Sequence, residues 1–591
     1  MISGGEFLIT PIIHGEIMTR EKFSEEQKEI ARVVEEFAVE RILKNKQAIE
    51  KYDKELSLTL FRECGGMGLL STDLPAKYGG SALGTVTAMR VAEGISFGES
   101  ASFSVTFSAH SGIATLPILF FGNGQQKSKY LPKIGSGEWM SAYALTEAEA
   151  GSDALSQKTT ATLTPDGKFY IVNGIKQFIS NGAWADVYIV FADAGARKMA
   201  AFIVERTWEG VSPGPEEHKM GIKGSSTTSV TFDNVKVPVE NLLGEIGQGH
   251  QVALDVLDLG RLKLGAADLG GCRAVIKEAV AYALQRRQFG RPIAQFDAIK
   301  SKFADMVIRT FALDSIVYRT AAMYDEILEH FDLESETPPP GIGETLEKLA
   351  IEASINKVHG TESLWIVADH GLQILGGYGF LEDYPMAAAA RDNRVDRIFE
   401  GTNEINRQII AGFALRKALM EELPLRENTK PFSDGRLRVN TEEVVKLIPD
   451  SEALAAEKRL VEMARQLALF VFNEAAIAYG QDLRNEQQIG EALADIFIDL
   501  YVIDSALRRV AQNPRRDRTW NAIVKVLIAE SAARMLALAR KIITALPDAA
   551  IRSQQLQDLL DFAKVMLPAT NTIALKREIA EDLYEVGKYR F

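Results

Sequence analysis

Residues 143–153 read Tyr-Ala-Leu-Thr-Glu-Ala-Glu-Ala-Gly-Ser-Asp, and at this stretch the sequence changes character. Before it, from Ser24 to about Gly137, apolar residues recur with the period of an α-helix between Gly-Gly turns. After it, short β-rich runs alternate with turn residues. These runs are Phe169–Val172, Val187–Ala192, Met199–Val204 and Ser229–Val235. The stretch therefore marks the start of a small β-domain that follows a helical one.

Helical periodicity returns after Val252 and continues to about Leu419, interrupted by an acidic, proline-marked insert at Glu334–Gly343. A segment with several prolines and no sustained apolar period follows, and the remaining sequence is again helical. The predicted fold class is mainly α with a small β-domain. The predicted parts are an α-helical domain at 1–140, a β-domain at 141–250, a helical domain at 251–422, a linker at 423–451 and an extra helical domain at 452–591.

The composition is that of an ordinary globular protein, with 46% hydrophobic and 25% charged residues in a chain of 591. The net charge of −13 argues against nucleic acid, or an anionic membrane, as a partner of the whole chain. Two cysteines, Cys64 and Cys272, suit a reducing compartment. The stretch Met1–Phe7 has an acid where an export signal needs basic residues, and no apolar run approaches the roughly 18 residues of a membrane span. We therefore expect a soluble cytoplasmic protein.

One internal repeat is visible at an offset of 190 residues. Ile299, Ala304-Asp305, Asp314-Ser315 and Arg319 recur as Ile489, Ala494-Asp495, Asp504-Ser505 and Arg509. So few matches can also arise by chance between helical sequences, and both interpretations stay open. If the repeat is real, the extra helical domain is a diverged copy of the helical domain that precedes it.

Glu400 lies in the stretch 397–404, Arg-Ile-Phe-Glu-Gly-Thr-Asn-Glu, between two apolar residues and a glycine. A carboxyl group with apolar neighbours in a water-poor cleft can have its pKa raised toward neutral pH and act as a general base. The glycine that follows, Gly401, lets a ligand approach the backbone closely. The alternative is a helix-capping or salt-bridged glutamate, which is the commoner role of such residues.

Two further segments carry groups that suit a nucleotide-like ligand. The stretch 143–153 concentrates hydroxyls, small residues and backbone amides, which can hydrogen-bond a planar heterocycle and a phosphate. Its alternative is a polar surface turn. The run 286–292, Arg-Arg-Gln-Phe-Gly-Arg-Pro, offers guanidinium groups for a pyrophosphate, or equally forms a basic helix end with its glycine stop. Neither segment decides the question alone.

Together these segments resemble the acyl-CoA dehydrogenase family over roughly Ser24 to Ala414, in the family's domain order. The motifs are Leu-Thr-Glu-x-x-x-Gly-Ser-Asp at 145–153, Arg-x-x-Phe-Gly-x-Pro-Ile at 286–293, and Gly-Gly-Tyr-Gly at 376–379 followed by Phe-Glu-Gly-Thr at 399–402. With its extra helical domain, the whole chain looks most like the very-long-chain subgroup and its bacterial counterparts. The fold implied is an α-helical domain, a β-barrel and a four-helix bundle, followed by a C-terminal helical bundle.

The resemblance implies FAD-dependent α,β-dehydrogenation of a long-chain fatty acyl-CoA to trans-2-enoyl-CoA, the first step of fatty-acid β-oxidation. Glu400 stands at the position of the family's base, which removes the α-proton while the β-hydrogen leaves as hydride to flavin N5. The thioester oxygen then receives hydrogen bonds from the backbone N–H of Glu400 and from a flavin ribityl hydroxyl. Some members carry the base on another helix beside an arginine. Here that position is Gly260, before Arg261, and glycine cannot act as a base.

Individual contacts carry over on matching positions, and no metal is implied. Positions that match the family's FAD contacts are Tyr143, Leu145, Thr146, Gly151, Ser152, Phe178, Ile179, Ser180, Arg286, Gln288, Phe289, Gln373, Gly376, Gly377, Thr402, Asn403 and Glu404. Arg286, Phe289, Gln373 and Gly377 would reach the FAD of a neighbouring subunit, which implies at least a dimer. Positions that match substrate contacts are Ser152, Asp258, Arg261, Phe399 and Gly401. At Phe178 many relatives have tryptophan, so stacking is retained and one N–H donor is lost.

The helix expected to line the acyl channel carries Ser104, Val105, Ser108 and Ala109, which are small where shorter-chain relatives have bulkier polar residues. This favours a long acyl chain, with simple helix packing as the alternative. We expect the extra helical domain to cover the surface that simpler relatives use to pair dimers into tetramers, which leaves a homodimer. The segment 426–440, near the membrane-binding stretch of very-long-chain relatives, has little apolar face and predicts at most peripheral membrane contact.

The electron acceptor implied by the resemblance is an electron-transferring flavoprotein. Two alternatives stay open: an acyl-CoA oxidase that uses oxygen, because such enzymes also carry an added helical domain, and a non-catalytic assembly scaffold. Retention of Glu400 together with the flavin motifs counts against the scaffold. Chain length, branching preference and the physiological acceptor are not defined by the sequence.

Overall fold

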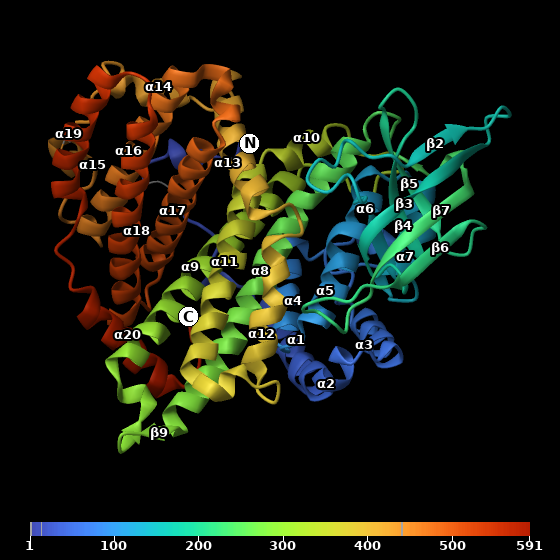
Figure 1. Ribbon diagram of the computed structural model, residues 1–591, viewed down its shortest axis with the longest axis horizontal. Helices are drawn as coiled ribbons and strands as arrows, with labels where there is room; N and C mark the ends of the chain where they lie inside the picture. The colour runs from blue at the N-terminus through green and yellow to red at the C-terminus, as the bar shows by residue number, and fades with distance from the viewer. Residues whose placement is uncertain (1–2, 13–14, 439–440) are drawn as a thin grey trace.

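The computed structural model describes residues 3–12, 15–438 and 441–591, and Figure 1 shows four bodies of secondary structure in chain order. A helical domain comes first, followed by a sheet, a bundle of long helices and a second bundle. Residues 1 and 2 of the N-terminal stretch, where we expect no export signal, and the last two residues of the segment 426–440 lie outside the described residues.

The N-terminal helical domain begins with a capped helix. The Ser24 side chain accepts a hydrogen bond from the Gln27 backbone N–H, and the Gln27 side chain accepts one from the Ser24 N–H, which satisfies donors at the helix start. The helices are α1 Glu25–Phe37, α2 Lys44–Glu50, α3 Lys54–Gly66, α4 Gly84–Ser96, α5 Ala101–Ser108, α6 Leu116–Phe121 and α7 Gly124–Gly135.

One described helical run, Ala101–Phe121, is long and apolar enough to cross a membrane by length and composition. It is longer than the apolar runs we expected from the sequence. Most of its apolar window, 83%, is buried inside the protein, which is also the pattern of a core helix.

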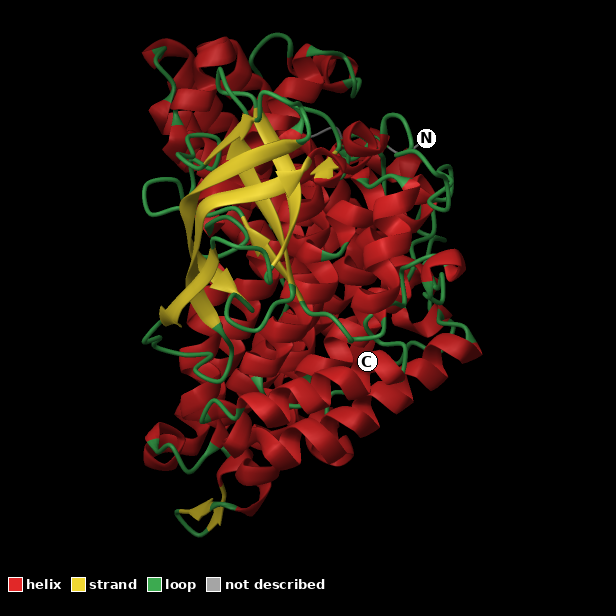
Figure 2. Ribbon diagram, turned by 90° about the vertical axis from the view of Figure 1, so that its right-hand side faces the viewer, coloured by secondary structure: helices red, strands yellow, loops and turns green. Residues whose placement is uncertain are grey.

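The β-domain is an eight-stranded sheet in the order β6-β7-β3-β2-β4-β5-β8, with β1 paired in parallel to β4. Its strands are β1 Ser141–Ala144, β2 Thr160–Leu163, β3 Phe169–Ser180, β4 Val187–Asp193, β5 Met199–Glu205, β6 Val211–Glu216, β7 Thr227–Pro238 and β8 Leu242–Leu243. The four β-rich runs expected from the sequence are confirmed as β3, β4, β5 and β7. Figure 2 shows the sheet lying against the helices on one side of the molecule.

Long helices form the centre of the molecule (Figure 1). They are α8 Gly249–Gln285, α9 Asp297–Leu328, α11 Ala350–Leu375 and α13 Asn403–Leu419, with the short helices α10 Ile342–Glu347 and α12 Pro385–Asp392. Between α8 and α9 a hairpin of β9 Arg287–Gln288 and β10 Arg291–Pro292 stands out from the helices (Figure 2). Short helical turns cover 376–380 and 393–397, and the second of them ends just before Glu400, the predicted base.

The segment predicted as a linker is folded onto the extra helical domain. Leu425, Phe432 and Leu437 are buried, and the Arg436 guanidinium donates to the Asp558 carboxylate at 2.7 Å. The elements here are α14 Leu425–Thr429, α15 Thr441–Leu447, α16 Ala455–Tyr479, α17 Gln487–Gln512, α18 Arg518–Ala545, α19 Ala549–Met566 and α20 Thr572–Val586. The sequence missed this packing because the buried side chains follow no helical or strand period.

Helix α9 and helix α17, which carry the two copies of the repeat, are joined by reciprocal ion pairs. Arg319 Nη1 donates to Asp504 Oδ2 at 2.6 Å and to Ser505 Oγ at 2.8 Å. In return, Arg509 Nη1 lies 3.3 Å from Asp314 Oδ2. In a twofold interface residue i contacts residue j and j contacts i, and these pairs follow that rule at the 190-residue offset. Helix α17 therefore covers α9 as a second copy of α9 would.

Candidate active site

Glu400 occupies a left-handed turn between the helical turn at 393–397 and α13. Its φ is +56° and that of Gly401 is +79°, so two successive residues adopt a conformation that is uncommon outside glycine. Glu400 Oε2 is buried and has no hydrogen-bond partner among the described residues. A buried polar atom without a partner is costly, which points to a partner supplied by a ligand.

Burial raises the pKa of Glu400 to about 7, and the positive charges of Arg261 and Lys357 oppose this rise. Near neutral pH the carboxyl group is thus divided between a form that accepts a proton and a form that has one. A general base works best when its pKa lies near the working pH. The turn therefore presents a carboxyl group that can exchange a proton near neutral pH.

Gly260, on α8, is packed closely against this carboxyl group. A Cβ atom placed there would lie 3.1 Å from Glu400 Oε2 and 2.6 Å from Ile113 Cγ2. Contacts under 3.0 Å are essentially never made by real Cβ atoms, so any larger residue would displace its neighbours. The glycine at this position keeps the approach to the base clear.

Predicted FAD contacts from the β-domain gather at the ends of β1 and β3. The Gln177 N–H donates to the Thr146 carbonyl at 2.8 Å, which ties the two strand ends together. Phe178, the next residue, has a φ of +57° and leaves 61% of its surface exposed, so one aromatic face is available for stacking. Ser180 is half-buried at the end of β3. Leu145 and Ile179 bury their side chains in the core and would meet a flavin only through their backbone.

Tyr143 links this region to the base. Its hydroxyl donates to the Ala253 carbonyl on α8 at 3.0 Å. Burial raises the pKa of Tyr143 well above its usual range, and the nearby Glu400 charge adds to the rise. The phenol therefore stays neutral next to the carboxyl group. Gly151 and Ser152, further along the same loop, are exposed.

A second group of predicted FAD contacts lies at the far end of the long helices. Arg286, Gln288, Gly376 and Gly377 line a cavity of about 390 Å³ that contains neither Glu400 nor any β-domain residue. Gln373 is also exposed there, and Phe289 is 92% exposed on the hairpin. Within one chain the structure therefore keeps these residues apart from the base, as expected for contacts to the FAD of a second subunit.

Thr402, Asn403 and Glu404, which follow the predicted base, differ in their burial and hydrogen bonding. The Thr402 hydroxyl accepts from the Ile405 N–H and caps α13. The Asn403 side chain is buried and bonded to Lys357 and Thr361, which favours a structural role for it. Glu404 faces the surface, where its pKa is lowered first by a hydrogen bond from its own backbone.

Predicted substrate contacts sit on α8 and at the turn. Arg261 Nη1 lies 2.5 Å from Asp258 Oδ1, and Arg261 Nε donates to the Glu400 carbonyl at 3.2 Å. Burial raises the pKa of Asp258 to about 6, although Arg261 opposes the rise. Phe399 is partly exposed, next to Gly401. The structure therefore brings Asp258, Arg261, Phe399 and Gly401 together at the base.

Sequence reasoning missed two residues of this site, Lys357 on α11 and Asn406 on α13. Lys357 Nζ donates to the Gly401 carbonyl at 2.8 Å, and Asn406 Nδ2 donates to the same carbonyl at 2.8 Å. The signal available was a lysine and an asparagine at positions that are buried in their helices.

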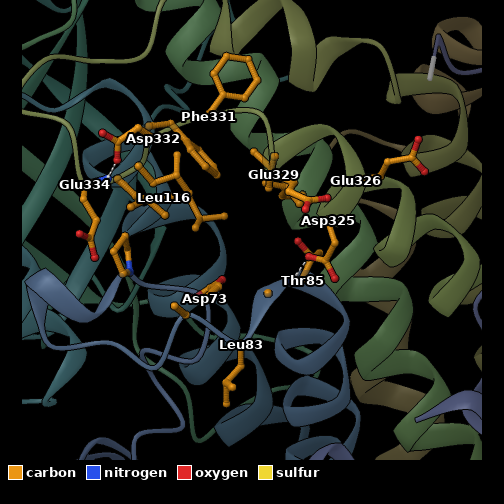
Figure 3. Close-up of a pocket in the computed structure, with 18 of the residues that line it drawn as sticks. Asp73, Leu83, Thr85, Leu116, Asp325, Glu326, Glu329, Phe331, Asp332 and Glu334 are labelled. Atoms are coloured by element: carbon orange, nitrogen blue, oxygen red, sulfur yellow. Dashed lines mark hydrogen bonds between the residues drawn. The ribbon is translucent and has the colours of Figure 1, made fainter. Parts of the chain in front are cut away.

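A larger cavity, of about 760 Å³, lies elsewhere and contains none of the predicted site residues. Figure 3 shows carboxylates around it, including Asp73, Asp325, Glu329 and Asp332, with Phe331 at its edge. Asp325 is engaged in accepting a hydrogen bond from the Val86 N–H at the start of α4. The cavity is therefore separate from the base and the flavin contacts.

The residues present fit FAD. An exposed aromatic face at Phe178, an unpartnered carboxylate oxygen at Glu400 and open space above Gly376 and Gly377 are all available to a flat, polar ligand. Phe178, Thr146 and Ser180 would hold the flavin ring, and Arg286 a pyrophosphate. The fold and this site together define a flavoprotein oxidoreductase.

Comparison with known proteins agrees with that class. Profiles described as the N-terminal, middle and C-terminal domains of acyl-CoA dehydrogenase match residues 24–138, 142–235 and 247–415. A second profile described as an acyl-CoA dehydrogenase C-terminal domain matches residues 463–559, within the extra helical domain. The chain belongs to the acyl-CoA dehydrogenase family.

Individual relatives cover nearly the whole chain. A probable acyl-CoA dehydrogenase of Bacillus subtilis (strain 168) is 41% identical over 591 residues, 99% of this chain and 98% of that protein. The mitochondrial very long-chain specific acyl-CoA dehydrogenase of Macaca fascicularis is 37% identical over 484 residues, 78% of this chain and 70% of that protein. The crystal structure of an acyl-CoA dehydrogenase complexed with FAD from Bacillus anthracis has a TM-score of 0.93 and 39% identity, covering 100% of both chains. The predicted family, fold class, enzyme class and FAD cofactor are confirmed.

Proposed function

We propose that this enzyme oxidises long-chain fatty acyl-CoA to trans-2-enoyl-CoA, with Glu400 as the base. The observation that carries the proposal is the buried Glu400 Oε2, which has no hydrogen-bond partner among the described residues and lies beside Gly260 on α8. A carboxylate in this state is prepared to receive a proton from a bound ligand.

The chain's own residues supply binding and proton transfer. As the substrate α C–H bond breaks, the proton passes to Glu400 Oε2, and negative charge develops on the thioester oxygen. Preorganised donors aimed at such developing charge lower the barrier. The family resemblance assigns that task to the Glu400 backbone N–H, which the turn orients. Phe178, Thr146 and Ser180 would hold the flavin ring of FAD, which would supply an acceptor for the β-hydrogen and its electron pair.

A narrow cavity of about 90 Å³ between α5 and α8 marks the proposed path of the acyl chain, and a long chain would have to push its lining residues apart, because ligand pockets usually measure roughly 300–1,000 Å³. Ala101, Ser104 and Val105 line it from α5, and Leu264, Ala267 and Gly271 line it from α8. Ser108 and Ala109, which we also expected to line the channel, are not among the residues that line this cavity.

The cavity lies further along α8 than the predicted base. From Gly260, beside Glu400, to Gly271, which lines the cavity, the helix advances about 16 Å at roughly 1.5 Å per residue. The small side chains that line the cavity therefore favour an acyl chain that extends past Gly260 along α8.

Helix α17 supports a homodimer. It covers α9 through the reciprocal pairs of Arg319 and Arg509, so this face of α9 is already occupied within one chain. The exposed hairpin with Phe289 remains available for a neighbouring subunit. Light scattering of the FAD-bound protein should give the mass of two chains, and a mass of four chains would exclude this arrangement.

The electron acceptor is proposed to be an electron-transferring flavoprotein. The FAD-bound enzyme should lose its yellow colour anaerobically with palmitoyl-CoA and regain it rapidly with an electron-transferring flavoprotein but slowly with oxygen. Peroxide formation at the turnover rate would instead identify an oxidase. Failure of every acyl-CoA to bleach a protein with bound flavin would support the non-catalytic scaffold and reject the proposal.

A further inference from the structure

The turn that carries Glu400 is held from three different helices. Arg261 on α8 donates to the Glu400 carbonyl at 3.2 Å. Asn406 on α13 donates to the Gly401 carbonyl at 2.8 Å and to the Thr402 carbonyl at 3.0 Å. Lys357 on α11 donates to the Gly401 carbonyl at 2.8 Å. A non-glycine residue persists in a left-handed conformation only where its surroundings over-determine it, and these donors do so.

Lys357 differs from Arg261, the other charged donor, because it forms no direct ion pair among the described residues. Its side chain is fully buried, and the oxygens it contacts are the Gly401 carbonyl and the Asn403 amide oxygen, at 2.8 and 2.7 Å. Arg261, in contrast, lies against the Asp258 carboxylate. Burying an ammonium group among neutral oxygens is costly, so its retention calls for a specific use.

Carboxyl groups from three elements surround this ammonium group. Burial lowers the pKa of Lys357 to about 8, and the charges of Glu400, Asp268 and Asp396, in that order, oppose the fall. Burial also raises the pKa of Asp396 to about 8 and that of Asp268 well above its usual range. Asp268 and Asp396 also interact with each other: their hydrogen bond raises the pKa of Asp268 and lowers that of Asp396, so the proton of this pair resides chiefly on Asp268.

The positive charge of Lys357 acts mainly on the carboxyl group of Glu400. Arg261 is paired with Asp258, and Tyr143 is a neutral phenol. Among the carboxyl groups near Lys357, Glu400 interacts most strongly with its positive charge. An opposite charge within a few ångströms favours the ionised form of a carboxyl group.

We propose that Lys357 is a positioning residue for this dehydrogenation: its ammonium group fixes the left-handed turn at Glu400–Gly401 and supplies the buried positive charge that favours the carboxylate form of the base. The inference rests on the proposed role of Glu400. It assigns Lys357 two separable contributions, a hydrogen bond to the Gly401 carbonyl and a charge. Substitutions that remove one or both of these contributions can tell them apart.

The test compares Lys357→Met, which removes donor and charge, with Lys357→Gln, which keeps an N–H donor. The readout is exchange of the α-hydrogen for deuterium in D2O, followed by mass spectrometry. The substrate is a 3,3-dimethylacyl-CoA, whose β-carbon has no hydrogen, so proton transfer is observed without oxidation. Exchange is measured on the FAD-bound enzyme between pH 5.5 and 9, and flavin content and melting temperature are recorded for each variant.

We expect Lys357→Met to slow exchange at least 10-fold and to move the acid limb of the pH profile upward by about one unit. Loss of a nearby cation disfavours the carboxylate, so the pKa of the base must rise. Lys357→Gln should recover most of the rate while keeping the upward shift. Lys417→Met is the matched control, because Lys417 is a second buried lysine that donates to carbonyls, here of Gly4 and Lys348, far from the base.

An acid limb that stays at the wild-type position in both Lys357 variants would overturn the inference, whatever happens to their melting temperatures. The same holds if Lys417→Met shifts the limb equally, since the effect would then reflect general loosening. If Lys357→Met does not retain FAD, Lys357→Gln alone decides by its pH profile. Absence of exchange in the wild type itself would instead refute Glu400 as the base, which separates the two failures.

Discussion

Replacing Glu400 by glutamine should slow flavin reduction by palmitoyl-CoA by a factor on the order of 10³, because general acid–base groups contribute about 10² to 10⁴. Glutamine has nearly the same shape but cannot accept the α-proton. FAD content should be unchanged, since the side chain faces the substrate gap. Anaerobic stopped-flow absorbance measures the rate directly, and Glu422→Gln, an exposed glutamate beyond α13, is the control.

The pKa of Glu400 also predicts how the rate of flavin reduction depends on pH. Burial raises the pKa of Glu400 to about 7, so the protonated and inactive form increases as the pH falls below that value. The wild-type rate of flavin reduction should therefore drop roughly 10-fold for each unit below about pH 6.5. A rate that is flat between pH 5.5 and 8, or a Glu400→Gln variant that reduces flavin normally, would contradict the assignment of the base.

Replacing Val105 by glutamine should have the second-largest effect, and only on long substrates. The longer, polar side chain would enter the narrow cavity opposite Leu264 and Ala267. We expect kcat/KM for palmitoyl-CoA to fall about 10- to 100-fold, in the range seen when a hydrophobic pocket loses a few methylene-sized volumes. Octanoyl-CoA ends before this point and should change less than about threefold.

Each substrate serves as the control for the other, since a general loss of folding would reduce both rates together. Val445→Gln, at an exposed position on α15, shows the effect of the same substitution away from the channel. Equal losses with palmitoyl-CoA and octanoyl-CoA would mean that the cavity between α5 and α8 does not hold the acyl chain.

The domain order could be read from the sequence because each body has its own local periodicity. Strands β3, β4, β5 and β7 were predicted because β-branched and aromatic residues cluster between turns there. Strand β6 was not, because Val211–Glu216 contains two prolines and a glycine, which do not favour strands. It forms by pairing with β7 at the edge of the sheet, where proline is tolerated. A local pattern cannot show such a partner.

The candidate site also contains residues that the sequence indicated and residues that it did not. Glu400 and the flavin-facing residues lie in short motifs whose spacing can be recognised. Lys357 was missed because its hydrogen-bond acceptor, the Gly401 carbonyl, is 44 residues away along the chain. The contact arises only when α11 packs beside the turn. The repeat places Arg319 and Arg509 at equivalent positions. Only the packing of α9 against α17 shows that each arginine forms an ion pair with the other helix.

The most direct test of the central claim is the product of a single anaerobic turnover. One equivalent of palmitoyl-CoA added to the FAD-bound enzyme should bleach the flavin and yield one trans-2-hexadecenoyl-CoA per bleached flavin, measured by mass spectrometry. Bleaching without the enoyl product, or intact palmitoyl-CoA beside fully oxidised flavin, would contradict the account.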